Sequence, residues 1–165
     1  MTVQTARVRT FDWEDPARLL AALEGRSGLD GLGAIAEGVI PPPPIARLLG
    51  FELVEVAHGH VVFAFEPEEW MYNPLGSVHG GVAATVLDSC MGCAVHTTLD
   101  AGVGYTTTDL HVRYLRPMSL ATGRVRAEGR VVHSGRRTAT ADGRLIVDGD
   151  GTLLAHATTG CAILA

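Results

Sequence analysis

Two features in one short stretch of this 165-residue chain could do chemistry: the glycine pair Gly80-Gly81 and the carboxylate of Asp88. Glycines at the start of a helix let another molecule approach the unpaired N–H groups, which can polarise a carbonyl. A carboxylate among apolar residues can act as a general base or a nucleophile, because desolvation raises its basicity. Together these groups suit attack on an activated carbonyl. The alternative for Asp88 is a structural hydrogen bond to a neighbouring backbone or hydroxyl group.

The spacing of these groups has a consequence for assembly. Gly80 and Asp88 are eight residues apart in the sequence, which corresponds to about 12 Å along one helix at 1.5 Å per residue. Both groups of one chain therefore cannot touch the same carbonyl. If they share a substrate, the Gly80 amide of one chain meets the Asp88 carboxylate of another, and the active site straddles a two-fold dimer interface.

The helix that carries both groups is expected to be buried. A turn-forming stretch from Asn73 to Ser77 leads into an apolar segment that begins at Gly80 and ends between Thr97 and Asp100. Its apolar residues cover nearly every side, so the rest of the domain, or a second subunit, must wrap it.

The sequence around this helix predicts strands. A hairpin precedes the helix, with its turn at His58-Gly59-His60, and four strands in a meander follow it. The expected strands are 51–57, 61–66, 105–114, 123–133, 137–147 and 153–164. This order is typical of an α+β fold in which an antiparallel sheet curls around one helix.

The segment before these strands differs in composition. We expect residues 1–44 to form an N-terminal arm packed on a domain of residues 45–165. A helix capped by Asp15 runs to Leu23, and the glycines from 25 to 33 predict a connector. Pro41 to Pro44 read as a stiff spacer, with a docking site for a polyproline-binding partner as the alternative. One helical turn at 45–49, closed by Gly50, leads into the domain.

The stretch from Asn73 to Gly81, reading Asn-Pro-Leu-Gly-Ser-Val-His-Gly-Gly and followed by Asp88, resembles the signature of hotdog-fold acyl-CoA thioesterases. The similarity is to the phenylacetate-pathway (PaaI-type) and hydroxybenzoyl-CoA thioesterase group, and it covers residues 45–164. It implies the hotdog fold, a curled antiparallel sheet around one long central helix. It also implies hydrolysis of an aryl- or alkyl-acyl-CoA to the free acid and coenzyme A, which enters as substrate, with no bound cofactor or metal.

The resemblance also assigns roles to residues. It implies that the Gly80 amide polarises the thioester carbonyl, that Asn73 orients the carbonyl or the attacking water, and that Asp88 of the partner subunit is general base or nucleophile. A hydroxyl early in the next strand assists, and counting back from Tyr114 favours Thr107 over Thr106. His79 supports the loop. Substrate and coenzyme A contacts map to Gly81, Tyr114, Arg116, Pro117, Ser134, Gly135, Arg136, Arg137 and Thr138.

Composition excludes some other functions. A formal charge of −5 and a pI of about 5.7 argue against nucleic-acid binding. All 13 basic residues are arginines, so an anionic ligand could still find a local basic rim. Three cysteines without a secretory pattern indicate reduced thiols, so Cys90-Met91-Gly92-Cys93 is interpreted as buried structure rather than a zinc half-site. His58 and His60 lack a third metal ligand and fit a polar turn. With no signal or membrane-spanning pattern, we expect a cytoplasmic protein.

Two other functions remain open from the residues. A non-catalytic acyl-CoA-binding or sensing module would keep the fold and the arginines but need no base. A hotdog dehydratase or hydratase would need an ionisable His–acid pair across the dimer, for which His79 with Asp88 is the candidate. A homodimer is expected from geometry, and a homotetramer from the resemblance alone.

Overall fold

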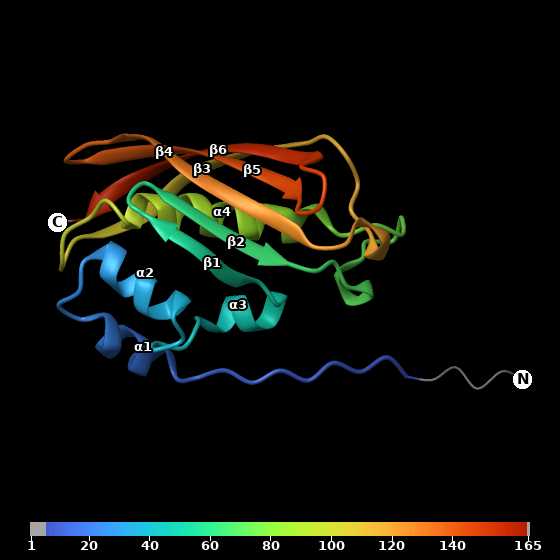
Figure 1. Cartoon of the computed structure of the whole chain (residues 1–165), viewed down its shortest axis with the longest axis horizontal. Coiled ribbons are helices and arrows are strands. Elements are labelled where there is room, and N and C mark those ends of the chain that lie inside the picture. Colours follow the sequence, from blue (N-terminus) through green and yellow to red (C-terminus); the bar gives the residue numbers. More distant parts are fainter. Residues whose placement is uncertain (1–5, 165) are drawn as a thin grey trace, which may run out of the picture.

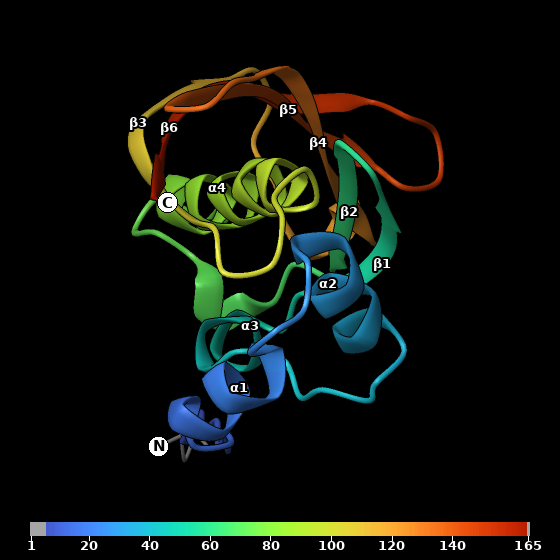
Figure 2. The same ribbon diagram turned by 90° about the vertical axis from the view of Figure 1, so that its left-hand side faces the viewer.

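The computed structural model describes residues 6–164, so the ends of the predicted arm and domain, residues 1–5 and 165, lie outside it. At its centre is helix α4, Gly80–His96, and one six-stranded antiparallel sheet curls about it (Figures 1 and 2). The strands are β1 (Glu52–Ala57), β2 (His60–Phe65), β3 (Gly104–Tyr114), β4 (Val125–Ser134), β5 (Thr138–Val147) and β6 (Leu153–Leu164). Single 3-10 turns lie at Glu69–Met71 and Leu120–Thr122. The predicted α+β class, with a curled sheet around one helix, is confirmed.

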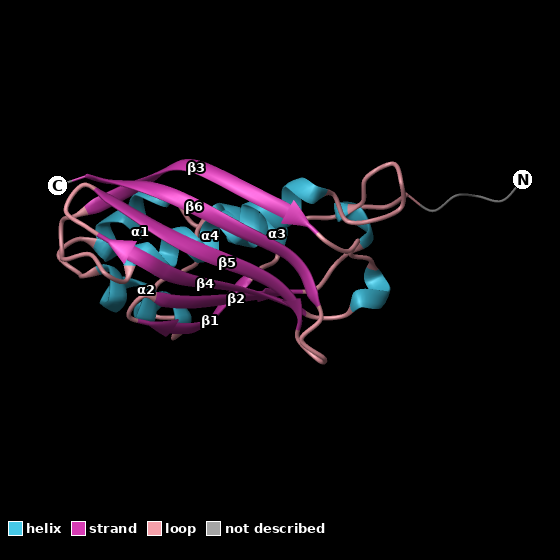
Figure 3. Cartoon of the chain, turned by 90° about the horizontal axis from the view of Figure 1, so that it is seen from above, coloured by secondary structure: helices cyan, strands magenta, loops and turns pink. Residues whose placement is uncertain are grey.

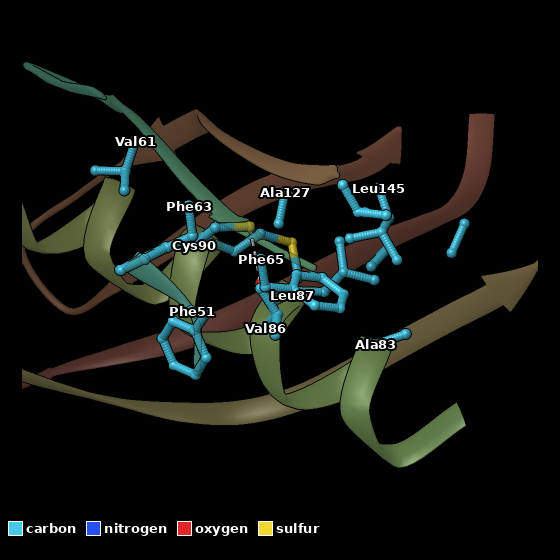
Figure 4. Packing of buried hydrophobic residues seen from close by; sticks show 14 of the residues in the cluster. Phe51, Val61, Phe63, Phe65, Ala83, Val86, Leu87, Cys90, Ala127 and Leu145 are labelled. Atoms are coloured by element: carbon cyan, nitrogen blue, oxygen red, sulfur yellow. Dashed lines mark hydrogen bonds between the residues drawn. The ribbon is translucent and has the colours of Figure 1, made fainter. Parts of the chain in front are cut away.

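The sheet buries most sides of helix α4, whereas one stripe of the helix, which includes Gly81, Thr85 and Asp88, stays partly exposed. Val86, Leu87 and Cys90 are completely buried, and they pack against strand residues such as Leu145 and Val61 (Figure 4). Burying side chains of this size contributes on the order of 2 kcal/mol each. The helix is thus held by the sheet in one position, and so are the polar groups that it carries.

Glycines in two strands let the sheet approach the helix closely. A Cβ atom on Gly129 of β4 would lie 2.3 Å from the carbonyl oxygen of Cys90, and one on Gly143 of β5 would lie 2.9 Å from the sulfur of Met91. Only glycine permits the first contact, because the obstacle is backbone. These positions set the distance between sheet and helix.

The strand order differs from the predicted meander at one strand. The order across the sheet is β1-β2-β4-β5-β6-β3 (Figure 3). Strands β4, β5 and β6 form a meander, but β3 lies beside β6 at the edge of the sheet and not beside β4. Helix α4 carries the chain from β2 to the far edge, where β3 pairs with β6, and β4 then returns to pair with β2. The expectation of four consecutive neighbours was wrong because chain order does not fix pairing order once a helix crosses the sheet.

Three helices precede the sheet and lie on the open side of its curl (Figure 2). They are α1 (Pro16–Leu23), α2 (Gly28–Ala36) and α3 (Pro44–Leu49). Asp15 caps α1 as predicted, accepting a hydrogen bond from the amide of Ala17 at 2.9 Å. Gly50 ends α3 in the left-handed conformation, with φ of 70°, also as predicted.

Helix α2 replaces most of the predicted glycine-rich connector. Ser27 caps it by accepting from the amide of Asp30. Gly28 is buried against the end of α4: its amide donates to the carbonyl of Leu99, and an added Cβ would lie 1.8 Å from the carbonyl oxygen of His96. The glycine serves close contact rather than flexibility, and the connector prediction was wrong for this reason.

Candidate active site

The first turn of α4 presents one free amide. His79 is the N-cap, and its Nδ1 accepts a hydrogen bond from the amide of Gly81 at 2.9 Å. The Gly81 amide is therefore occupied. Among the described residues the Gly80 amide has no hydrogen-bond partner, so it can donate to a ligand at the positive end of the helix.

The space in front of Gly80 is narrow and lined by predicted contact residues. The Tyr114 hydroxyl donates to the carbonyl oxygen of Gly80 at 3.0 Å, and a Cβ on Gly80 would lie 3.1 Å from the Tyr114 ring. A cavity of about 340 Å³ opens here. Its lining residues are Asn73, Ser77, Val78, Gly80, Ala83, Tyr114, Leu115, Arg116, Pro117 and Met118.

The Asn73 side chain is engaged with its own loop. Its Oδ1 accepts from the amide of Leu75 at 2.8 Å, and its Nδ2 donates to the hydroxyl of Ser77 at 3.2 Å. An Asx turn of this kind holds the loop that delivers the chain to α4. Asn73 lines the cavity beside Gly80 while fixing the loop.

Asp88 and Thr107 meet in a second place. The Thr107 hydroxyl donates to Oδ1 of Asp88 at 2.9 Å. Side chains alternate along a strand, so Thr107 shares the face of Tyr105, which packs against α4, whereas Thr106 points to the other face. A β-bulge at Thr108 follows directly, as often happens beside active sites.

The sequence-predicted residues therefore fall into two separate cavities. Asp88 and Thr107 line one of about 590 Å³, and Asn73 and Gly80 line the other, with no lining residue in common. Within one chain the structure does not bring the free amide and the carboxylate together. This separation agrees with the distance of about 12 Å expected along a helix for eight residues.

The predicted coenzyme A contacts are also divided. Tyr114, Arg116 and Pro117 line the Gly80 cavity, and Arg116 donates to the carbonyl of Leu153 at 2.6 Å. The turn from Ser134 to Thr138 lies at the opposite end of the helix: Ser134 hydrogen-bonds Thr98, just beyond the C-terminus of α4, at 2.8 Å. That turn contains Gly135, Arg136 and Arg137, with both arginines exposed.

Sequence reasoning missed two side chains beside Asp88. Tyr105 and Cys93 line the same cavity, and both are held neutral: burial first, then the nearby Asp88 charge, raises the pKa of Cys93 to about 12. Burial likewise raises the pKa of Tyr105. Gly92 makes room for Tyr105, since a Cβ there would lie 2.8 Å from its hydroxyl. Strand alternation from Thr107 was the available signal for Tyr105.

The other two cysteines are packing residues in this structure. Cys90 and Cys161 are buried, and burial raises the pKa of both thiols. Within residues 6–164 no three His, Cys, Asp or Glu side chains cluster as a metal site would require. No helix in that range has the length and apolarity to span a membrane.

Comparison with known proteins identifies the family. A profile described as the thioesterase superfamily matches residues 75–154, which include Gly80, Asp88 and Thr107. Acyl-coenzyme A thioesterase 13 from Homo sapiens is 32% identical over 111 residues, covering 62% of this chain and 79% of the human protein. The chain belongs to the thioesterase superfamily.

Solved structures support the same assignment for the fold. A phenylacetic acid degradation-related protein from Ralstonia eutropha has a TM-score of 0.71 at 29% identity. The match covers 79% of this chain and 98% of the Ralstonia chain. The PaaI protein from the phenylacetic acid degradation operon of E. coli has a TM-score of 0.73 at 19% identity, with coverage of 84% and 97%. The expected hotdog fold and PaaI-type resemblance are confirmed.

Proposed function

We propose that this chain is an acyl-CoA thioesterase whose active site is formed by two copies of the chain. The observation that carries the proposal is the division of polar groups between two cavities: the Gly80 amide, without a partner among residues 6–164, in one, and the Asp88–Thr107 pair in the other. Each cavity holds half of what thioester hydrolysis needs. Membership of the thioesterase superfamily supports the reaction class.

The chemistry follows from the two halves. The Gly80 amide donates to the thioester oxygen and stabilises the negative charge that develops there. The Asp88 carboxylate either takes a proton from the attacking water or attacks the carbonyl carbon itself, to be released by water in a second step. In both routes the C–S bond breaks, the acyl group gains a hydroxyl, and the coenzyme A sulfur leaves and takes a proton. Thr107 holds the carboxylate in position by donating to Oδ1.

A two-fold arrangement of chains would join the halves. Strand β3, which carries Thr107, is an edge strand of the sheet and can pair with a second β3. Antiparallel pairing would set the Asp88 region of one chain against the Gly80 end of the other. It would also bring the exposed Arg136 and Arg137 of one chain to the Gly80 cavity of the other, where they suit the phosphates of coenzyme A.

The test is replacement of the carboxylate. Asp88→Asn should lower kcat for acyl-CoA hydrolysis by about a hundredfold or more, because general-base catalysis contributes 10²–10⁴-fold. Release of free thiol from a panel of aryl- and alkyl-acyl-CoAs measures it. Asp142→Asn is the matched control, since this exposed carboxylate lies on the interior strand β5 and lines neither cavity. Unchanged turnover in Asp88→Asn contradicts the mechanism, and tight binding without hydrolysis by the native protein favours a binding module instead.

A further inference from the structure

One wall of the cavity beside Asp88 comes from the segment before β1, which comprises the end of the predicted arm and helix α3. Residues Leu32, Ile35, Pro42, Pro43, Ile45 and Ala46 line one side of it, opposite α4 and β3. All six lie outside residues 75–154, which match the thioesterase superfamily. We call this cavity the acyl chamber and residues 28–50 the arm wall.

The arm wall is anchored to the domain rather than laid loosely on it. Gly28 fits against the backbone of His96 and donates to the carbonyl of Leu99 at 3.1 Å. Ile40 and Ala46 are only 2% and 3% exposed. The amide of Phe51, just before β1, donates to the carbonyl of Ala46 at 3.2 Å and closes the C-terminal end of α3. The segment is therefore packed against the domain at α2 and at the start of α3.

The chemistry of the chamber suits an uncharged, apolar guest. The Phe51 and Phe63 rings, in T-shaped contact with centroids 5.2 Å apart, line it together with the aliphatic arm wall. Its charged lining residues are Asp88, Glu52 and Arg47, two acids and one base. A cavity with that balance is unsuited to the phosphates of coenzyme A or to a carboxylated acyl group, because its acids outnumber its base.

The size of the chamber sets a further limit. Its volume of about 590 Å³ is roughly that of twenty water molecules at 30 Å³ each, and it lies within the usual range for small-molecule sites. An acetyl group would leave most of it empty. A medium-length alkyl group or an aryl group would bury its apolar surface against the arm wall.

We infer that the arm wall forms the acyl-binding pocket of this thioesterase, that it selects uncharged apolar acyl groups much larger than acetyl, and that Ile45 limits their length. The inference rests on the proposed function, because it places the thioester carbonyl at Asp88 and Thr107. From there the acyl group extends under α2 and α3. Ile45, 42% exposed at the start of α3, stands where the chamber meets solvent.

The experiment changes Ile45 in both directions. Ile45→Trp should reduce the ratio of kcat/KM for dodecanoyl-CoA to that for acetyl-CoA by about tenfold or more, because a mismatch of one methylene group in an apolar pocket is worth about 10–200-fold. Ile45→Ala should shift the optimum toward longer chains in a series from acetyl- to hexadecanoyl-CoA. Val54→Trp and Val54→Ala are matched controls, since Val54 is 37% exposed nearby on β1 but does not line the chamber. Melting temperatures verify that all four variants fold.

The possible failures are distinguishable. If the native protein hydrolyses acyl-CoAs but both Ile45 variants keep its chain-length profile, the inference is overturned while the proposed function stands. If the kcat/KM for succinyl-CoA equals that for hexanoyl-CoA, the selection for uncharged acyl groups is overturned. If no thioester is hydrolysed, the proposed function fails, and calorimetric binding of dodecyl-CoA thioether to native and Ile45→Trp proteins still tests the chamber: equal affinity overturns it, and weaker binding to the variant supports it.

Discussion

Gly80 and Gly81 are adjacent in the sequence, yet their amides have different tasks. The Gly81 amide is bound by the His79 ring, which completes the helix cap. The Gly80 amide is free among the described residues and faces a cavity. Gly80 also keeps its Cβ position open for the Tyr114 ring. If hydrolysis depends on this amide, a substitution that removes the N–H of residue 80 should lower activity more than one that only adds a Cβ atom there.

Gly80→Pro should lower kcat by about a hundredfold, the effect of removing one donor to a developing oxyanion. Proline is favoured at the first position of a helix and lacks the N–H, so the change removes the donor without ending α4. His79 already has φ of −61° and ψ of 135°, the conformation that proline requires of the residue before it. Steady-state release of free thiol measures the loss.

The control for this variant is Gly80→Ala, which adds the same Cβ but keeps the amide. Its Cβ would meet the end of the Tyr114 ring at 3.1 Å, and the partly exposed ring can yield by a few tenths of an ångström. A loss of only a few-fold is expected. Equal losses in the two variants would assign the effect to crowding of Tyr114, and the amide would then have no special role.

The chemical groups were easier to predict from sequence than their surroundings. Asp88 and Gly80 stood out because each is unusual in an apolar helix, and Thr107 followed from counting along a strand whose length the sequence predicted well. Engagement of Asn73 with its own loop depends on a turn that folds back on itself. The acyl chamber lies between α2 and α3 on one side and α4 and β3 on the other. These elements are far apart in the chain, so no local sequence pattern predicts the distance between them.

At the scale of elements, the predictions failed where tertiary contact overrides a local signal. Glycines between 25 and 33 predict a flexible connector, yet Gly28 and Gly31 are buried in α2 because the helix packs closely on its neighbours. The position of β3 at the sheet edge was likewise not predicted, since it depends on where α4 ends. Both errors concern the walls of the acyl chamber.

The junction of α4 with the arm should make stability depend on pH. His96 ends α4, and burial lowers its pKa below the ordinary 6.5, while its Nδ1 is buried with no hydrogen-bond partner among the described residues. The unfolded chain therefore binds a proton here more readily than the folded one. The free energy of unfolding should fall as pH drops below about 6.5 and level off once the folded form is also protonated. Thermal melts between pH 8 and 5 measure this dependence.

His96→Phe should make that dependence shallower and leave stability near neutral pH unchanged or slightly higher. The ring lies 5.5 Å from the Tyr105 ring, so an aromatic replacement keeps the packing while removing an unsatisfied nitrogen. His58→Phe, in the exposed turn before β2, is the matched control for a histidine-to-phenylalanine change away from this junction. His60 contributes in the same direction, because burial and then Arg130 lower its pKa, so some slope should remain in His96→Phe. An undiminished slope there would contradict the role given to His96.

At the scale of the whole molecule, the proposed function gives each chain two unlike halves of a site, each completed by a second copy of the chain. This arrangement predicts complementation between inactive variants. A dimer of one Asp88→Asn chain and one Gly80→Pro chain contains one site with both defects and one site with neither. Purified with a different tag on each chain, it should show about half the native kcat per dimer, although each parent dimer is nearly inactive.

The alternative assembly gives a different number. If each chain carried a complete site, both sites of the mixed dimer would hold one defect, and its activity would equal the mean of the two nearly inactive parents. The mixed dimer therefore separates a shared site from a site within one chain, whatever the loss in each parent. A control dimer of Asp88→Asn with Asp88→Asn, carrying the same two tags, excludes activity from contaminating native enzyme. Recovery in the mixed dimer alone would establish that the amide and the carboxylate act on one thioester from different chains.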